Sequence, residues 1–276
     1  MCNIFNQMCE MPPPGEKKIA ASVREDGCGG RRANPGKEAC VLTVDELAQM
    51  IDHSVLLPQQ TEKDLEEGVA LACKYQVKCM VPKIFQIPRA KELLKGSPVR
   101  LCAAIAFPQG LNPPEVKRYE AEWALGHGAV ELDMVMNISA LKSRLYDFVE
   151  RDIAGVVEAA GRYGAPVKVI LETCLLTDEE KVAACKIAER AGAGFVKTST
   201  ATQPGGATVE DIRLMRATVG PTVVVKASAY VTDIDKTLAL YEAGARRFGT
   251  GYTANILEGL KQRLAGQPAV ASGSRS

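Results

Sequence analysis

The sequence has little of the material that metal centres and disulfide frameworks need. Only two of its 276 residues are histidines, His53 and His127, and no two of its nine cysteines form a Cys-x-x-Cys pair. Several cysteines fall in the first 40 residues, and the others stand singly in apolar segments. We therefore expect neither a zinc site nor a disulfide scaffold, and we predict no metal and no cofactor.

An excess of charge of either sign is also missing, because 34 Lys and Arg stand against 33 Asp and Glu. A nearly neutral chain has no general attraction to nucleic acid or to an anionic membrane surface. No apolar run approaches the roughly 18 residues of a membrane span. The first residues lack the basic and apolar regions of a secretion signal. We expect a cytoplasmic protein that binds neither nucleic acid nor membrane.

The composition that is present, 46% hydrophobic and 24% charged residues, is the ordinary globular mixture and can bury a sizeable core. Residues 1–42 hold Gly and Pro clusters with few aliphatic side chains, which predicts a flexible N-terminal arm. Residues 263–276 are small and polar and predict a flexible tail. A single domain is expected between them, over residues 43–262.

Within that domain, short β-branched runs alternate with amphipathic stretches, which indicates repeated βα units. Thr61, Thr177, Thr208 and Thr232 each precede a carboxylate by three positions, a pattern typical of helix starts. Eight units predict an α/β fold, a single (β/α)8 TIM barrel. An open doubly wound sheet is the alternative, but the early glycine fingerprint of that fold is missing. The expected strands are 51–57, 77–82, 99–107, 129–136, 166–172, 194–198, 221–227 and 245–249.

Three segments share one register, in which Gly-Ala is followed four positions later by a distinctive residue. Those residues are Asp133, Lys197 and Gly249. Each falls near the C-terminal end of an expected strand, where the loops of a (β/α)8 barrel build the active site. We therefore look for function at this end of the barrel.

Two lysines, Lys197 and Lys226, follow apolar runs on successive strands. Lysine is rarely buried unless it is paired, so either side chain could simply extend to the barrel mouth or pair with an acid. The functional alternative is a Schiff-base nucleophile, because desolvation and a neighbouring ammonium lower the pKa of an amine. Asp133 could move protons or balance the two cations. The residues alone do not decide which lysine reacts.

Other polar side chains in the strands have two interpretations. Asp52 could hold a substrate hydroxyl or brace the site, whereas core hydrogen bonding would also explain Asp52 and His53. Lys168 and Glu172 alternate with apolar residues, and we expect them to form a supporting charged layer inside the barrel.

Seven motifs follow one another along the chain: Ile51-Asp-His-Ser, Phe107-Pro-Gln-Gly, Glu131-Leu-Asp-Met-Val-Met-Asn, Lys168-Val-Ile-Leu-Glu-Thr-Cys, Phe195-Val-Lys-Thr-Ser-Thr, Gly205-Gly-Ala-Thr and Lys226-Ala-Ser. In their order and spacing they resemble the deoxyribose-phosphate aldolase family over about residues 43–260. The resemblance implies a TIM barrel that joins acetaldehyde reversibly to glyceraldehyde 3-phosphate, without a metal, as a homodimer or homotetramer.

The resemblance also implies roles for individual residues. Lys197 would form the Schiff base, Lys226 would tune it, and Asp133 would join Lys226 and a water in a proton relay. Asp52 matches a substrate-binding acid. Cys79 matches a cysteine near the site and is not expected to be the nucleophile.

The chain departs from the family in the loops that usually hold phosphate. Gly is usual at Ala201, and Gly-Gly is usual after Ser228, where Ala229 and Tyr230 stand instead. Such loops bind phosphate through backbone N–H groups. Tyr252 likewise follows Gly249-Thr-Gly251, where Gly-Thr-Ser is usual. We therefore expect Tyr230 and Tyr252 to partly fill or reshape the pocket and to weaken binding of a phosphate ester, although Gly205 and Gly206 could keep some anion contact. The expected substrate-binding residues are Asp52, Cys79, Thr200, Gly205, Gly206, Ser228, Tyr230, Gly249, Gly251 and Tyr252.

Other functions have some support in the sequence. The Gly249-Thr-Gly251 turn could suggest dinucleotide binding, but too little chain follows it for a βαβ unit. Two histidines and the lack of Gly-x-Ser-x-Gly disfavour a metal-dependent aldolase and a serine hydrolase. A non-catalytic barrel used for binding remains open, as does a family member that acts on a non-phosphorylated or larger aldehyde.

Overall fold

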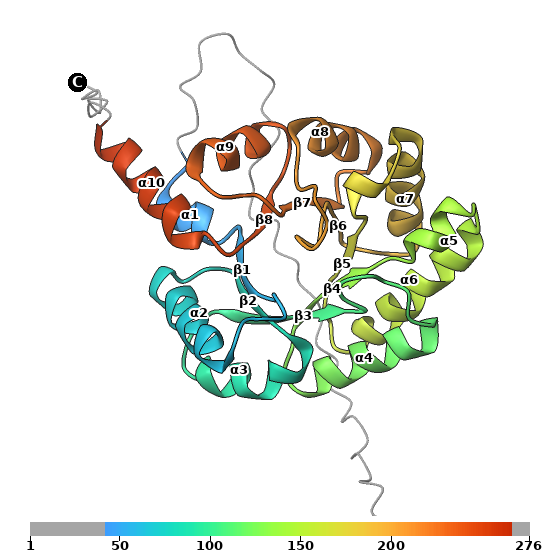
Figure 1. The fold of residues 1–276 in the computed structure, drawn as a ribbon, viewed down its shortest axis with the longest axis horizontal. Coiled ribbons are helices and arrows are strands. Elements are labelled where there is room, and N and C mark those ends of the chain that lie inside the picture. Colours follow the sequence, from blue (N-terminus) through green and yellow to red (C-terminus); the bar gives the residue numbers. More distant parts are fainter. Residues whose placement is uncertain (1–41, 267–276) are drawn as a thin grey trace, which may run out of the picture. The chain divides into compact units, whose positions relative to one another are not determined.

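The computed structural model describes residues 42–266. Over these residues, parallel strands β1 to β8 close into a barrel in sequence order (Figure 1). The predicted (β/α)8 barrel is thus confirmed. The strands are β1 (Ile51–Val55), β2 (Cys79–Pro82), β3 (Arg100–Ile105), β4 (Glu131–Val135), β5 (Val167–Ile170), β6 (Phe195–Lys197), β7 (Val224–Ser228) and β8 (Arg247–Thr250).

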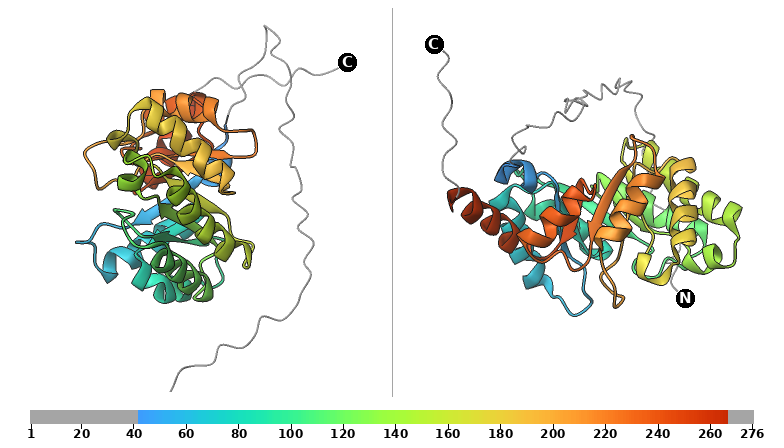
Figure 2. Two further views of the ribbon diagram at one scale, coloured as in Figure 1. Left: turned by 90° about the vertical axis from the view of Figure 1, so that its right-hand side faces the viewer. Right: turned by 90° about the horizontal axis from the view of Figure 1, so that it is seen from above.

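Helices surround the barrel, as the two further views in Figure 2 show. Two 3-10 turns, η1 (Ile84–Gln86) and η2 (Thr173–Leu175), follow β2 and β5. The helices are α1 (Val44–Ala48), α2 (Glu62–Tyr75), α3 (Ile87–Leu93), α4 (Pro114–Gly126), α5 (Ile138–Lys142), α6 (Tyr146–Gly161), α7 (Asp178–Arg190), α8 (Val209–Thr218), α9 (Ile234–Glu242) and α10 (Thr253–Gly266).

The expected helix starts follow from side-chain capping, with one difference. Thr61 and Thr177 form capping boxes, and the Thr208 side chain accepts from the third residue of α8. The prediction at Thr232 is wrong by one residue: the cap is Asp233, whose carboxylate accepts from the Lys236 N–H at 2.9 Å. Because Asp233 is itself a strong capping residue, it displaces the threonine beside it.

Two further boundaries differ from the sequence expectation. Helix α1 was not predicted, and a capping box between Thr43 and Glu46 begins it. Helix α10 continues to Gly266, past the expected domain end at residue 262. The expected arm lies outside the described residues except for Leu42, as does the expected tail beyond Gly266.

The alternation of side chains along each strand separates an apolar layer from a polar one. Outward-facing residues such as Leu132, Val169 and Val225 pack into the main core with helix residues such as Ile153 and Ile256. The opposite face of the strands carries charged side chains into the barrel. In residues 42–266, none of the helices combines the length and apolarity needed to cross a bilayer.

Candidate active site

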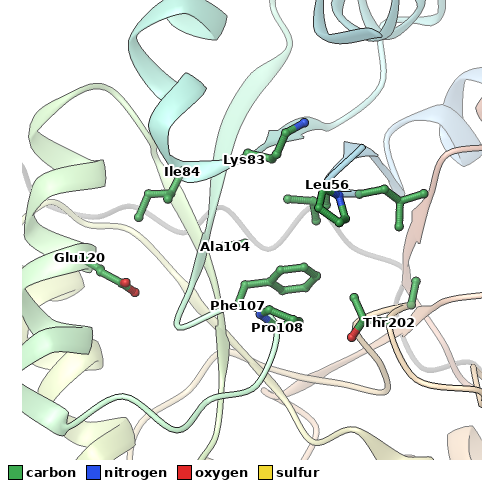
Figure 3. Close-up of a pocket in the computed structure, with 11 residues that line it drawn as sticks. Leu56, Lys83, Ile84, Ala104, Phe107, Pro108, Glu120 and Thr202 are labelled. Carbon is green, nitrogen blue, oxygen red and sulfur yellow. The ribbon is translucent and has the colours of Figure 1, made fainter. Parts of the chain in front are cut away.

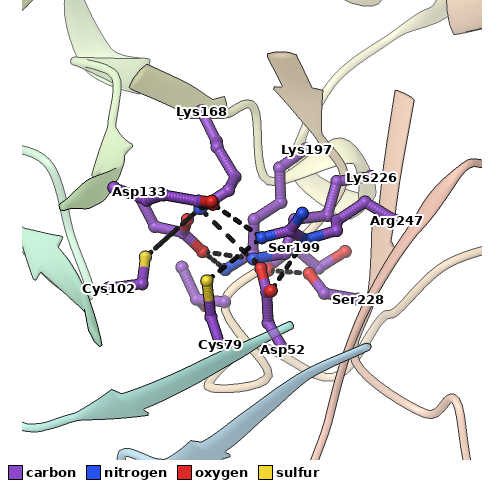
Figure 4. A network of polar contacts seen from close by, with 12 residues as sticks. Asp52, Cys79, Cys102, Asp133, Lys168, Lys197, Ser199, Lys226, Ser228 and Arg247 are labelled. Carbon is purple, nitrogen blue, oxygen red and sulfur yellow. Dashed lines mark hydrogen bonds and ion pairs between the residues drawn. The ribbon is translucent and has the colours of Figure 1, made fainter. Parts of the chain in front are cut away.

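Strand register brings the two lysines of the sequence analysis together. Lys197 on β6 stands directly opposite Lys226 on β7, and Asp133 on β4 stands opposite Lys168 on β5. Because residues at the same level of parallel strands share one face, their side chains meet inside the barrel (Figure 4). The strand positions alone therefore create a compact charged site.

Asp133 is the centre of this site. Its Oδ2 accepts from the Lys197 Nζ and the Lys226 Nζ, each at 2.7 Å, and its Oδ1 accepts from the Lys168 Nζ at 2.7 Å. The side chain is fully buried. Burial opposes ionisation, but the three ammonium groups hold the pKa of Asp133 well below its usual value. It is therefore a carboxylate near neutral pH.

Lys197 and Lys226 differ in the number of carboxylates that pair with them. Asp52 accepts from Lys226 at 2.5 Å, so Lys226 lies between two carboxylates, whereas Lys197 contacts Asp133 alone. Burial lowers the pKa of both amines, but Asp133 and Asp52 together raise the pKa of Lys226 above its ordinary value. For Lys197, burial and the adjacent Lys226 ammonium outweigh Asp133 and lower the pKa. The amine that releases its proton more readily is Lys197.

Deeper in the barrel, Arg247 on β8 joins the network. Its Nε donates to the Asp52 Oδ1 at 2.7 Å, and its Nη2 donates to the Glu131 Oε2 at 2.6 Å. Lys168 also contacts Glu131, at 2.9 Å. Despite opposing burial, the pKa of Lys168 is raised, first by Asp133. The expectation that Lys168 supports a charged layer agrees with this geometry.

Cys79 lies beneath the reactive groups. It is buried, and its Sγ accepts from the Arg247 Nη2 at 3.1 Å. Burial raises the pKa of its thiol well above the ordinary value, so it is not a thiolate nucleophile. Asp52, Cys79 and Glu131 converge closely enough to bind a cation, but each of them contacts the Arg247 guanidinium, which supplies the positive charge there.

A cavity of about 30 Å³ lies over the lysines and is lined by Lys197, Lys226 and Ser228, among other residues. This is about the volume of one small molecule such as water. The cavity shares Thr200 and Gly249 with a cleft of about 420 Å³ that opens at the C-terminal ends of the strands. The Lys197 amine is therefore buried but reachable from the barrel mouth.

The wider cleft is built from the loops in which the sequence departs from the family. Tyr230 and Tyr252 line it, but they are 58% and 53% exposed. Thus the tyrosines lie at its opening and leave a cleft between the loops. Thr200 also lines the cleft, and its hydroxyl is held by Glu172 and by Thr202.

Three residues stand where glycine is usual, and each has the positive φ angle that favours glycine. Ala201, Ala229 and Tyr230 have φ angles of 72°, 67° and 55°. Positive φ costs a non-glycine residue about 1–2 kcal/mol. The loops thus retain the course that glycine would allow, at the expense of strain, and this outcome could not be inferred from the substitutions themselves.

The glycines of the expected site differ in how tightly they are packed. A Cβ on Gly205 would overlap Cys174, and a Cβ on Gly206 would lie 2.5 Å from the Tyr230 ring. At Gly249 it would lie 2.9 Å from the Ser228 Cβ, whereas at Gly251 it would meet only ordinary contacts. Three of the four glycines are therefore required by close packing.

Arg247 and Glu131 are site residues that the sequence analysis did not single out. Each stands two positions before a residue that was singled out, Gly249 and Asp133 respectively. The two-residue period of a strand places such pairs on one face, so the signal was present. His53, by contrast, faces away from this network, and its Nδ1 lies 2.9 Å from the Thr253 Oγ1.

A further chamber of about 620 Å³ adjoins the cleft, with which it shares Leu56, Phe107 and Ala201. Most of its lining is apolar, and Figure 3 shows Phe107 and Pro108 beside it. Glu120, the acid of this chamber, accepts from the Ala106 N–H at 2.7 Å. No pattern along the sequence indicates this space.

Comparisons with known proteins agree with this arrangement. A family model described as DeoC/LacD family aldolase matches residues 46–255. The deoxyribose-phosphate aldolase of Streptococcus sanguinis is 50% identical over 214 residues, covering 78% of this chain and 96% of that protein. The Methanothermobacter thermautotrophicus enzyme of the same name is 50% identical over 220 residues, covering 79% and 97%. The tetrameric deoxyribose phosphate aldolase structure from Aeropyrum pernix has a TM-score of 0.75 at 34% identity, covering 80% and 93%.

Proposed function

The chain belongs to the DeoC/LacD family of aldolases, and on that basis we propose that its Lys197 carries a Schiff-base aldol reaction. Acetaldehyde and glyceraldehyde 3-phosphate would be joined to 2-deoxyribose 5-phosphate, and the reverse reaction would cleave that sugar phosphate. The enzyme is a class I aldolase. The relatives do not favour the alternatives of a non-catalytic barrel or of a non-phosphorylated or larger aldehyde.

The observation that carries the proposal is the unequal pairing of two adjacent lysines. Lys197 has one carboxylate partner and lines the cavity, whereas Lys226 has two. A Schiff base needs an unprotonated amine, and burial together with a neighbouring ammonium lowers the pKa of Lys197. Lys226 is then the residue that tunes the nucleophile.

The proposed aldol reaction uses only the two aldehydes, water and the side chains of the site. The Lys197 Nζ attacks the acetaldehyde carbonyl carbon, and the carbinolamine loses water to give an iminium ion. Loss of a proton from the adjacent carbon gives an enamine, whose carbon bonds to the carbonyl carbon of the acceptor aldehyde. Water then hydrolyses the new iminium ion and regenerates the amine. Asp133, Lys226 and a water would relay the protons, since Asp133 contacts both amines at 2.7 Å.

The phosphate would bind in the cleft formed by the loops that follow β6, β7 and β8. In (β/α)8 barrels the loops after the last two strands often bind phosphate with a helix N-terminus. Here Gly251 and Tyr252 line the cleft immediately before the 14-residue helix α10. The positive φ angles of Ala229 and Tyr230 support a backbone cradle in the loop after β7.

The proposal also covers the oligomeric state of the protein and its place in the cell. We expect a homodimer or homotetramer in the cytoplasm, and an Aeropyrum pernix relative is described as tetrameric. The mass of the purified protein in solution tests the first of these. A monomer at working concentration would contradict it.

The proposed reaction is tested by comparing cleavage of 2-deoxyribose 5-phosphate with cleavage of unphosphorylated 2-deoxyribose. Release of acetaldehyde is measured with a coupled alcohol dehydrogenase. We expect a higher kcat/KM for the phosphate ester, because its dianion adds contacts in the cleft. Equal kcat/KM values would contradict phosphate recognition, and no release from either sugar would contradict the aldolase reaction.

A further inference from the structure

The charged layer inside the barrel has more basic than acidic groups. Ion pairs link four cationic side chains to three carboxylates within residues 42–266. All seven side chains are buried. An unmatched charge in such an interior is strongly unfavourable, so one basic group is driven to release its proton. The seven are Lys168, Lys197, Lys226, Arg247, Asp52, Glu131 and Asp133.

The identity of that group follows from the contacts. Arg247 cannot lose its proton in a protein. Lys168 contacts Asp133 and Glu131 at 2.7 and 2.9 Å and lies 3.7 Å from Asp52. Lys226 pairs with two carboxylates, and Lys197 pairs with one. Lys197 is the least compensated.

We propose that Arg247 is a positioning residue for the aldol reaction, because its permanent charge occupies Asp52 and Glu131 and leaves Lys197 as the amine without a carboxylate of its own. The inference rests on the proposed role of Lys197 as nucleophile. It extends that role to a residue that lies beneath the site and lines neither the cavity nor the cleft. In this account Arg247 sets the proton balance of the whole layer.

Other titratable groups around the layer form no ion pair with its four cations. Burial raises the pKa of Glu172, which faces Lys197 from the end of β5, and its carboxyl group accepts from Thr200 instead of pairing with a lysine of the layer. The Cys79 and Cys102 thiols, from β2 and β3, stay neutral because burial raises their pKa values, to about 12 for Cys102. Arg100 contacts Glu131 at 3.1 Å, but its side chain is 41% exposed, so solvent screens its charge.

The test uses opposite changes of charge at the two ends of one ion pair. Arg247→Met keeps an unbranched stem and removes the cation, whereas Glu131→Gln keeps the shape and removes the anion. The rate of acetaldehyde trapping on Lys197 with cyanoborohydride is measured across pH for each variant and for the double variant. Arg100→Met, which removes the exposed partner of the same carboxylate, is the matched control.

We expect the pH midpoint of trapping to rise by about one unit in Arg247→Met, as for a unit charge about 10 Å away at an effective dielectric constant of about 20. It should fall in Glu131→Gln and return near the wild-type value in the double variant. The Arg100→Met midpoint should move much less. If Arg247→Met does not fold, Arg247→Gln, which also removes the cation and keeps a polar side chain, takes its place with the same rise expected.

Midpoints that stay in place, or that move in the same direction in both single variants, would overturn the role of Arg247. Loss of stability alone lowers the yield of folded enzyme and does not shift midpoints in opposite directions. Failure of the wild-type protein to form any adduct at Lys197 would instead overturn the proposed function. The two failures are therefore distinguishable.

Discussion

Removal of the Lys226 ammonium should raise the pKa of Lys197 by a large amount. Both amines lie 2.7 Å from the same Asp133 oxygen, so their nitrogens are no more than twice that distance apart. At about 5 Å and an effective dielectric constant of about 20, two unit charges repel by about 3 kcal/mol, which is about 2 pKa units. Lys226→Met also leaves Asp133 free to pair with Lys197 more strongly, which acts in the same direction.

The consequence is a lower fraction of reactive amine near neutral pH. Two pKa units correspond to a fall of about 100-fold wherever Lys197 is already mostly protonated. The pH dependence of kcat/KM for cleavage of 2-deoxyribose 5-phosphate measures this, with circular dichroism as the control for folding. A lower activity at an unchanged pH midpoint would refute the electrostatic role and leave Lys226 a different task.

Three further predictions concern neighbouring groups. Asp133→Asn keeps the shape but removes the proton acceptor, so kcat/KM should fall by about 100-fold or more with circular dichroism unchanged; wild-type rates would make Asp133 a structural partner. Ala229→Gly relieves a positive φ of 67° and should raise the free energy of unfolding by up to about 1 kcal/mol in denaturant titrations, whereas a loss would contradict the strain. Burial lowers the pKa of His53 from 6.5 to about 4, so the unfolded state binds the proton more tightly. About 3 kcal/mol of stability should therefore be lost as the pH falls from 6.5, the pKa of the unfolded state, to about 4, the pKa of the folded state. His53→Asn should flatten the pH dependence of thermal unfolding, and an equal slope would contradict this origin.

The strands and the charged site could be predicted from the sequence because short-range patterns determine them. The βα alternation located the strands, and the shared Gly-Ala register placed Asp133 and Lys197 at the barrel mouth. What the residues could not decide was which lysine reacts, because this depends on partners from other strands. Asp52 on β1 pairs with Lys226 on β7, and no pattern along the chain indicates that contact.

The loops around the cleft were predicted less well. Replacing glycine by tyrosine suggested a partly filled or reshaped pocket, and most residues avoid positive φ. The backbone instead keeps positive φ at Ala201, Ala229 and Tyr230, and the tyrosine rings lie at the mouth of the cleft. Tertiary contacts hold these residues in the strained conformation, for example the packing of Tyr230 against Gly206.

The central claim is that the Lys197 amine forms the covalent bond to acetaldehyde. Incubation with acetaldehyde and borohydride, followed by peptide mass spectrometry, tests this directly. We expect one reduced ethyl group on the peptide that contains Lys197, and none in Lys197→Ala, whose circular dichroism should remain that of a folded barrel. An ethyl group on Lys226 or Lys168 instead, or undiminished labelling in Lys197→Ala, would contradict the account.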